Sequence, residues 1–400
     1  MSADHSITQF DGDLPFQDRR IKIPTAALSL LLLVSIILQY TLLPTSVAYT
    51  FISLAYVVLV SFHILHDGKI QSDSTYTKLY LLFTAVVSVR LLFDPDVINV
   101  ARLLALLTFT TANLFILPSI LPFNQFLSLT ARVSAVLVAI GFLPYLGFPT
   151  QVGFFDLSLW GADIYWYEGL QPITSIFNNP NQLGGLALIG SIGAIHEFFE
   201  YSESKSALLS VITIFGLLMT NWRTGWAILV ISILLYIFYM MFNREMFVIA
   251  VVGSLLSVVI GLLMMFDLVP GPHFLSEFSI GGRRTRWIAS VQALFEQPLW
   301  GYGFSGITEF EDGANNPHNS YIRIFTGFGI IGGLLYLLIV LGTTVESARR
   351  VKTYQGVTLT ILLVGFCILQ VFNQLTFIGI SMRSTIISLM LGYFIIGEVQ

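Results

Sequence analysis

Residues 246–266 read MFVIAVVGSLLSVVIGLLMMF, an apolar run without a charged side chain. About 20 residues of α-helix cross the hydrocarbon core of a bilayer, and this run has that length. Charged residues make up 10% of the chain and hydrophobic residues 55%, with a mean hydropathy of +0.81. Soluble domains usually carry about 25% charged residues. The composition therefore excludes a water-soluble protein and predicts an all-α, polytopic helical membrane protein.

Similar apolar runs recur along the chain, and together they predict about 12 transmembrane helices within a single integral-membrane domain over residues 1–400. The other predicted spans are 24–43, 45–65, 76–93, 97–121, 127–148, 181–199, 205–220, 222–242, 320–345, 356–377 and 380–397. Residues 1–23 are charged and lack an apolar core, so we expect a cytoplasmic tail and not a signal peptide. Long connections in compact proteins are usually functional. Two such connections, 149–180 and 267–319, are predicted as outer loops, the larger lying between helices 9 and 10.

The basic residues set the orientation. Every lysine falls on the side of the N-terminus, which predicts cytoplasmic termini in the cell membrane under the positive-inside rule. The basic residues on the outer side are all arginines: Arg102, Arg223, Arg283, Arg284, Arg286 and Arg383. Arginine offers a planar fork suited to phosphate, whereas lysine is a point charge. Arginines that extend to the membrane interface are the alternative, both for the cluster and for Arg383.

Four of the outer arginines occur in two motifs. Arg283, Arg284 and Arg286 lie within GGRRTRW at 281–287, and Arg223 lies within TNWRTGW at 220–226. A charge at the start of a span is costly unless it faces a cavity or a partner. Both motifs therefore predict binding of an anionic, phosphate-bearing substrate. For Arg223, an anchor in the aromatic belt beside its two tryptophans is the alternative.

Two Asn-Pro motifs stand where the chain re-enters the membrane from outside. FNNPNQLGG at 177–185 contains Asn179 and Asn181, and NNPHN at 315–319 contains His318 and Asn319. Asparagine caps helix N-termini, which present free N–H groups to anions. A neutral His318 would accept a proton from an acceptor hydroxyl, and adjacent arginines would keep it deprotonated. Simple turns, and a structural histidine, are the alternatives.

The 149–180 loop mixes aromatic and acidic side chains. They are Phe154, Phe155, Asp156, Trp160, Asp163, Tyr165, Trp166, Tyr167 and Glu168. Such a set is typical of a sugar-stacking surface and equally of a segment lying in the membrane interface. Both interpretations stay open, and the two roles are compatible.

No metal or other cofactor is predicted. Glu309, Glu311 and Asp312 are outer acidic residues, but they show no recognisable ligand spacing. The single cysteine, Cys367, lies inside an apolar run, which excludes a thiolate cluster and an intramolecular disulfide.

Taken in order, these motifs resemble those of the O-antigen ligase and polymerase superfamily, which are membrane glycosyltransferases of the C type. The resemblance covers residues 170–345 and rests on order and spacing, because no single motif is highly specific. The matching motifs are FNNPNQLGG, NWRTGW, Gly282-Arg283 followed by Trp287, PLWGYGFSG at 298–306, His318-Asn319-Ser320-Tyr321, and the glycine-rich span through Gly333. The family typically has about twelve spans with its large outer loop before the tenth, as predicted here.

The resemblance implies a function in polysaccharide biosynthesis at the cell envelope. A glycan carried on a polyisoprenyl pyrophosphate is transferred, without metal or nucleotide sugar, to an acceptor hydroxyl on a glycan, lipid or protein. Arg223 and Arg283 would hold the pyrophosphate, and His318 would activate the acceptor. Further substrate-binding residues are expected at Arg284, Arg286, Asn319, Asn179 and Asn181.

Two departures and several alternatives remain. Arg284 and Arg286 are additional to the family pattern, and Trp222 precedes Arg223 where the family commonly has a small hydroxyl residue. Ligase, polymerase and protein O-oligosaccharyltransferase differ only in the acceptor, which the motifs do not identify. A secondary transporter would place ionisable residues near the bilayer midplane, and here they cluster at one face. A structural partner would not explain the arginines or His318, and no nucleic-acid partner is expected.

Overall fold

The computed structural model describes residues 23–66, 74–93, 95–153, 155–266, 268–271, 283–304 and 317–399. The predicted tail, apart from its last residue, lies outside these ranges. So do Phe154, Gly282 and the acidic residues Glu309, Glu311 and Asp312.

A helix or a series of helices occupies every predicted span. The bounds are α1 Ile23–Leu38, α2 Thr45–Leu65, α3 Ser74–Leu91, α4 Val97–Ala105, α5 Leu117–Ile120, α6 Phe123–Gly141, α7 Pro180–Tyr201, α8 Ser204–Met219, α9 Arg223–Met241, α10 Arg244–Met265, α13 Ser320–Arg350, α14 Tyr354–Phe372 and α15 Met382–Ile395. Two π-helical segments, Leu106–Thr110 and Ala112–Ile116, join α4 to α5.

The connections hold the remaining elements. In the 149–180 loop, β1 (Gln151–Val152) pairs antiparallel with β2 (Phe155–Asp156) after a 3-10 turn at Leu143–Leu146. One helix within the 267–319 segment was not predicted, α12 (Arg283–Glu296). We call the end of the bundle that carries α12 and the 149–180 loop the loop end.

The fold class is confirmed as an all-α polytopic membrane protein. Within the described residues, 7 helices or joined helices are long and apolar enough to cross a membrane: Thr45–Leu65, Val97–Ile120, Phe123–Leu146, Arg223–Met241, Arg244–Met265, Ser320–Arg350 and Tyr354–Phe372. Shorter apolar helices lie at Thr25–Leu38, Ser204–Met219 and Met382–Ile395. The exact number of crossings stays a prediction, because α3 and α7 occupy predicted spans but do not meet this criterion.

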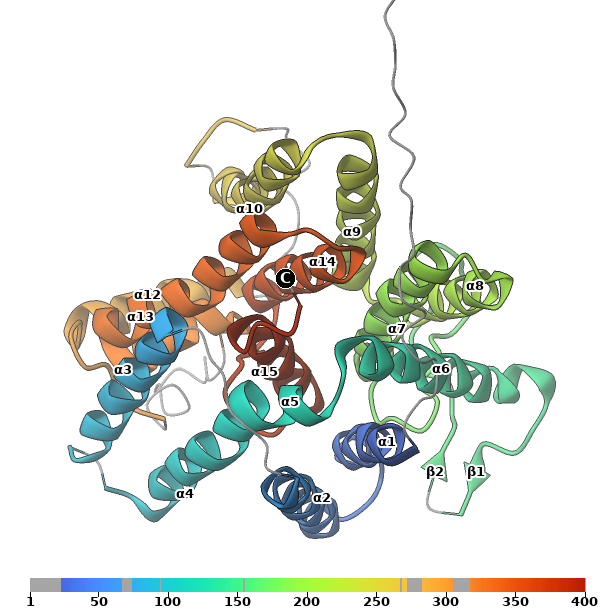
Figure 1. Cartoon of the computed structure of the whole chain (residues 1–400), viewed down its shortest axis with the longest axis horizontal. Coiled ribbons are helices and arrows are strands. Elements are labelled where there is room, and N and C mark those ends of the chain that lie inside the picture. Colours follow the sequence, from blue (N-terminus) through green and yellow to red (C-terminus); the bar gives the residue numbers. More distant parts are fainter. Residues whose placement is uncertain are drawn as a thin grey trace, which may run out of the picture.

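Helices α14 and α15 lie near the middle of the molecule, with the other helices around them (Figure 1). The most apolar stretch of α14 is 89% buried, whereas that of α10 is 11% buried. Apolar side chains exposed on peripheral helices are expected where lipid, and not water, is the solvent. The apolar run at 246–266, which forms most of α10, is therefore a peripheral helix.

Small residues bring α6, α7 and α8 close together. A Cβ at Gly190 would collide with Ser134 of α6, and one at Gly216 would collide with Val138 of the same helix. Close backbone approach of this kind is how membrane helices gain dispersion energy where lipid supplies no hydrophobic driving force.

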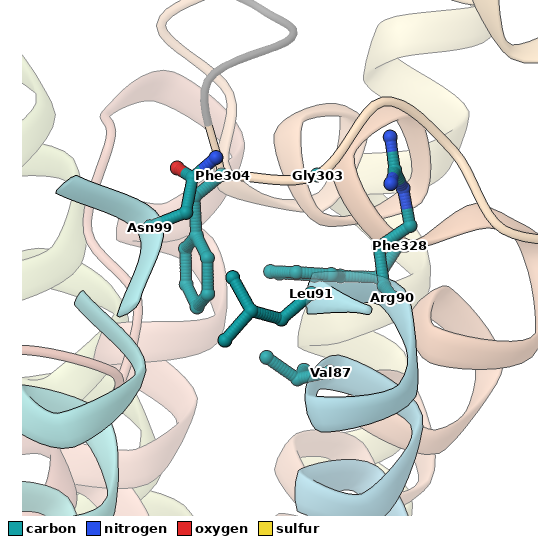
Figure 2. A pocket seen from close by; sticks show the side chains of 7 residues that line it. All are labelled: Val87, Arg90, Leu91, Asn99, Gly303, Phe304 and Phe328. Atoms are coloured by element: carbon teal, nitrogen blue, oxygen red, sulfur yellow. The ribbon is translucent and has the colours of Figure 1, made fainter. Parts of the chain in front are cut away.

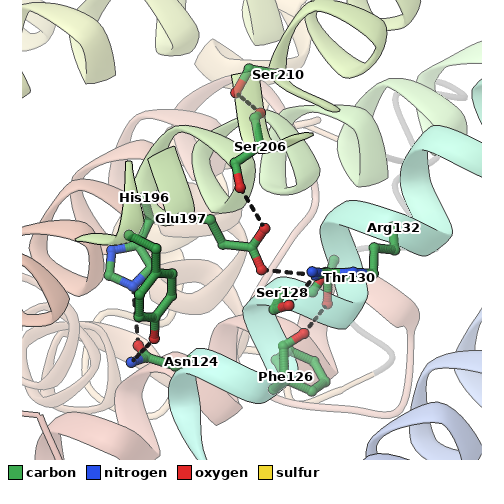
Figure 3. Close-up of polar contacts among 10 residues, drawn as sticks. Asn124, Phe126, Ser128, Thr130, Arg132, His196, Glu197, Ser206 and Ser210 are labelled. Atoms are coloured by element: carbon green, nitrogen blue, oxygen red, sulfur yellow. Dashed lines mark hydrogen bonds and ion pairs between the residues drawn. The ribbon is translucent and has the colours of Figure 1, made fainter. Parts of the chain in front are cut away.

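Polar contacts fasten the same three helices at the end opposite the loop end (Figure 3). The buried Glu197 of α7 pairs with Arg132 Nη1 at 2.8 Å. Ser206 of α8 donates to the other carboxylate oxygen of Glu197 at 3.3 Å. His196 Nε2 lies 3.1 Å from Asn124 Oδ1. Pairing and hydrogen bonding are what a buried carboxylate requires.

Helix α13 is broken one third of the way along. Phe328 (φ −123°, ψ 17°) and Gly329 (φ 65°, ψ −172°) leave helical geometry, so the element consists of two half-helices. Gly329 adopts a backbone conformation essentially restricted to glycine. Broken helices at membrane depth require other partners for the freed backbone groups.

The segment 298–303 supplies those partners. The N–H of Ile330 donates to Pro298 O at 2.7 Å, and the N–H of Gly303 donates to Gly327 O at 2.7 Å. The two backbones approach closely. A Cβ added at Gly301 would collide with the backbone of α13, and one added at Gly329 would collide with the backbone of the 298–303 segment. Gly301 of the PLWGYGFSG motif and Gly329 of α13 are therefore needed for this docking.

Arg90 fixes the docked segment to α3. Its Nε donates to Gly301 O at 3.0 Å. A small hollow between α3, the start of α4 and the break in α13 is lined by Arg90, Asn99, Gly303 and Phe328, among others (Figure 2). Arg90, which the sequence placed within a span, thus contacts backbone at the loop end.

Candidate active site

Helix α12 begins with three arginines in its first turn, Arg283, Arg284 and Arg286. The first turn of a helix carries a partial positive charge and favours acidic residues, which are absent from this turn. Cations there oppose the helix dipole, and an anion bound beside them relieves the repulsion. The local sequence therefore favours ligand binding over helix stability.

Trp287 attaches α12 to the turn before α13. Its indole N–H donates to Pro317 O at 2.5 Å, and the side chain is 5% exposed. The ring stacks on Phe266 at the end of α10, with centroids 5.8 Å apart. At the other end of α12, Glu296 accepts a hydrogen bond from the Tyr302 hydroxyl at 2.7 Å. That bond raises the pKa of Tyr302 to about 12, so the phenol stays a donor.

His318 lies between Pro317 and the N-cap of α13. Its φ of 49° is in the left-handed region, which non-glycine residues rarely adopt. The next residue, Asn319, is the N-cap, and its side chain accepts from the N–H of Ile322 at 3.0 Å. Ser320 donates to Asn373 O at 2.7 Å. The two residues that follow His318 are thus held in place, Asn319 by capping α13 and Ser320 by its bond to the α14–α15 connection.

Electrostatic interactions link His318 to the arginines. Burial lowers the pKa of His318, and the charges of Arg283 and then Arg286 lower it further. Burial likewise lowers the pKa of Arg283, followed by repulsion from Arg286 and Arg223. Arg283 therefore lies close enough to interact with His318, Arg286 and Arg223, which come from the turn before α13, α12 and α9. Such a cluster combines anion binding with a neutral base.

Arg223 is the first residue of α9 and lies over the ring of Tyr165, 5.2 Å from its centroid. The N–H of Tyr165 donates to Asn221 Oδ1 at 3.1 Å. The aromatic 149–180 loop is therefore attached to the turn that presents Arg223.

Arg284 points elsewhere. Its guanidinium lies over Phe266, 5.6 Å from the ring centroid, and the residue is exposed. Of the three arginines in α12, the structure associates Arg283 and Arg286 with His318 and places Arg284 against α10.

The asparagines of the first Asn-Pro motif act locally. Asn179 caps α7, and its side chain accepts from the N–H of Asn181 at 2.8 Å. Asn181 O accepts from Arg383 Nη2 at 2.5 Å. No contact in the described part of the chain joins Asn179 or Asn181 to the arginine cluster or His318. Their predicted role in substrate binding stays a prediction.

Arg383 is buried within the bundle. The residue is 6% exposed, and its guanidinium lies over Trp222, 5.1 Å from the ring centroid. It joins α15 to the N-terminus of α7 and to the residue before Arg223. Sequence reasoning left this role undetected, because the partners are about 160 and 200 positions away and no local pattern marks them.

The described residues contain no group of three or more His, Cys, Asp or Glu placed to hold a metal ion. The predicted absence of a required metal stays a prediction for solution experiments.

Comparison with known proteins completes the description of the site. Residues 208–337 match the O-antigen ligase family model. No curated protein matches the chain. The matched range runs from α8 into α13 and includes Arg223, the three arginines of α12, His318 and Asn319, whereas Asn179, Asn181 and Arg383 lie outside it. The match supports a relation to the O-antigen ligase superfamily through residues 208–337.

Proposed function

We propose that this protein is a membrane glycosyltransferase that moves a glycan from a polyisoprenyl-pyrophosphate carrier to an acceptor hydroxyl. The reaction takes place at the outer face of the cytoplasmic membrane, with both termini in the cytoplasm. An O-antigen ligase type of transfer is the first candidate, with a polysaccharide polymerase or a protein O-oligosaccharyltransferase as alternatives that differ in the acceptor. Donor glycan-lipid and acceptor are its partners, in contact with membrane lipids.

One observation carries this proposal. Arg283 and Arg286 of α12 lower the pKa of His318, and Arg223 of α9 lowers the pKa of Arg283. Mutual repulsion of this kind favours a multiply charged anion, and a pyrophosphate offers several oxygens for guanidinium forks. The lowered pKa of His318 keeps the imidazole neutral and able to accept a proton at neutral pH.

The chemistry balances with these groups alone. The acceptor oxygen forms a bond to the anomeric carbon of the donor glycan while the bond between that carbon and the pyrophosphate oxygen breaks. His318 takes the acceptor proton. The carrier pyrophosphate leaves with the electron pair, and Arg223 and Arg283 stabilise the charge that develops on it. The proposed transfer is metal-independent, because the guanidinium groups neutralise the leaving group.

Arg286 and Arg284 have different expected roles. Arg286 acts on His318 and Arg283, so we assign it to the anion site. Arg284 stacks on Phe266 and is expected to support α12 more than to bind donor.

The test is transfer in liposomes. Purified protein is given a lipid-pyrophosphate-linked oligosaccharide, with glycan, lipid and peptide acceptors in parallel, and wild type is compared with His318→Ala. We expect transfer to one acceptor by wild type, loss of transfer in His318→Ala, and retained donor binding. The acceptor used distinguishes ligase, polymerase and protein oligosaccharyltransferase.

A different result would refute the proposal. If no acceptor is glycosylated and the donor instead appears on the opposite side of the liposome, the protein is a transporter. Full activity of His318→Ala would remove the general-base role while leaving the arginine site to be tested separately.

A further inference from the structure

A hollow of about 210 Å³ lies in the 149–180 loop, beside the turn between α1 and α2. Its apolar wall comes from Leu42, Leu159, Ile176 and Phe177. Its polar wall comes from Asp156, Ser158, Trp160 and Gly161, together with Thr174 and Asn178. Neither wall contains any residue that we place in the arginine cluster.

Backbone and side-chain hydrogen bonds hold the hollow in shape. Asp156 Oδ1 accepts from the N–H of Ser158 at 2.9 Å, and Ser158 O accepts from the Thr174 hydroxyl at 2.7 Å. The N–H of Trp160 donates to Pro172 O at 2.9 Å. The N–H of Asn178 donates to Tyr40 O at 2.9 Å, which fixes the loop to the end of α1. The lining groups are therefore pre-organised, which lowers the entropic cost of binding.

Several polar groups at the hollow remain available to a ligand. Within the described ranges, no hydrogen bond occupies Asp156 Oδ2, the Ser158 hydroxyl, the Trp160 indole N–H or the Asn178 side-chain amide. Trp160 is 41% exposed. The set offers a charged acceptor, an amide that donates and accepts, a hydroxyl and an amphipathic aromatic ring.

The chemistry of this lining favours a polyol over a lipid headgroup. Sugar hydroxyls donate to carboxylates and amides, and the apolar faces of sugar rings stack on aromatic side chains. Phospholipid headgroups carry a phosphate, and the hollow is lined by one carboxylate and by no lysine or arginine. An anionic headgroup would meet repulsion there.

The 149–180 loop that forms most of the hollow also contacts Arg223 of the candidate active site. Asn178 immediately precedes Asn179, the N-cap of α7. Later in the same loop, Tyr165 lies under Arg223. One loop therefore carries both the hollow and a contact of the arginine cluster.

We infer that the hollow between Asp156, Trp160 and Asn178 is a saccharide subsite, which binds an uncharged sugar unit of a glycan substrate. The inference rests on the proposed glycosyltransferase function for the class of ligand. Asp156 accepts hydrogen bonds from sugar hydroxyls, Trp160 stacks on the ring, and Asn178 donates and accepts. The surface is distinct from the arginine cluster, so glycan and pyrophosphate are recognised by separate groups.

The experiment measures binding of free oligosaccharides to the full-length protein in nanodiscs. An array of neutral gluco-, galacto-, manno- and rhamno-oligosaccharides supplies the probe, and the best binder is titrated in solution. The test variants are Asp156→Asn and Trp160→Leu. Asparagine keeps the oxygen that accepts from Ser158 N–H, so the loop fold is preserved. Asp163→Asn and Trp166→Leu, in the same loop but outside the hollow, are the matched controls.

We expect each test variant to weaken binding of the probe by about tenfold or more, as the loss of a charge-assisted bond or a stacked ring predicts, while the controls bind as wild type does. In transfer assays the same variants raise KM for the glycan substrate and leave kcat unchanged. His318→Ala binds the probe normally.

Failure of the inference and failure of the proposed function give different results. If wild type binds no neutral probe, or if binding survives both test substitutions, the hollow is not a saccharide subsite, even when transfer is intact. If saccharide binding depends on Asp156 and Trp160 and no transfer occurs with any acceptor, the subsite stands and the transferase function falls. Loss of co-purified phospholipid in the test variants, with unchanged saccharide binding, would assign the hollow to lipid.

Discussion

The indole N–H of Trp287 and the carbonyl oxygen of Pro317 are 2.5 Å apart, and this bond joins the arginine-bearing helix α12 to the residue before His318. Thirty positions of chain separate the two residues. The bond therefore connects the helix that carries Arg283 and Arg286 directly to the turn that carries the imidazole.

Trp287→Phe tests this connection. The aromatic ring still stacks on Phe266, but Pro317 O loses its donor, which costs about 1 to 3 kcal/mol when a buried acceptor is left unpaired. We expect a lower Tm and a lower kcat with little change in donor binding. Trp166→Phe, at an exposed position, is the control. A wild-type Tm and kcat would show that the bond does not position the site.

Arg286→Gln tests the electrostatic control of His318. Burial, Arg283 and Arg286 all lower the pKa of this histidine, so removal of the Arg286 charge raises it. Activity that requires the neutral imidazole is lost as pH falls through that pKa. The acidic limb of the profile of kcat/KM against pH should therefore move to higher pH. The guanidinium of Arg284 lies over Phe266, so Arg284→Gln should leave the acidic limb at the wild-type pH. The same acidic limb in wild type and in both variants would contradict the proposed action of Arg286 on His318.

Arg283→Lys separates charge from geometry at the anion site. An ammonium keeps the charge but not the bidentate fork, and loss of a well-placed donor to a developing charge lowers the rate by about 10² to 10³. Because the charge remains, we expect a fall of at least about tenfold in kcat/KM. Arg284→Lys is expected to keep nearly full activity. The reverse order of the two variants would transfer the phosphate role to Arg284.

Gly329→Ala tests the break in α13. The φ of 65° and ψ of −172° are open essentially to glycine alone, and a Cβ would collide with Leu299 O. Backbone strain of this kind costs about 1 to 3 kcal/mol before the collision is added. We expect a large drop in Tm and in the yield of monodisperse protein. Gly253→Ala, on the open face of α10, should be neutral, since no atom lies within 4 Å of its added Cβ.

Removal of divalent cations should leave transfer unchanged, because the arginines stabilise the leaving group in the proposed reaction. Activity of the purified protein is measured before and after exhaustive EDTA treatment. Inactivation that magnesium or manganese reverses would show that a metal is required.

The sequence predicted the helices well because apolar length is a local property. The run at 246–266 corresponds closely to α10, and the run at 320–345 lies within α13. It did not predict the break at Phe328 and Gly329, because the apolar pattern continues across it and the compensating bonds come from residues 298–303. Helix α12 was missed for a different reason, since it is too polar and short to resemble a span.

The sequence was enough to propose which residues form the candidate site, but not how their side chains are arranged. Residue chemistry and motif order pointed to Arg223, Arg283 and His318; Arg283 interacts electrostatically with both of the others, and the roles of the three stay predictions. The separate orientation of Arg284 depends on Phe266, and the burial of Arg383 depends on Asn181 and Trp222. Contacts between residues so distant in sequence are set by packing, which local patterns do not encode.

The bond between Arg383 and Asn181 has a consequence for biogenesis. Helix α15 enters the membrane long after α7 and α9, yet its arginine supports the N-terminus of one and the residue preceding the other. During synthesis, the turn that presents Arg223 therefore lacks one of its supports until α15 is in place. Under the proposed function, a nascent chain would therefore transfer glycans poorly until α15 has packed against α7 and the start of α9.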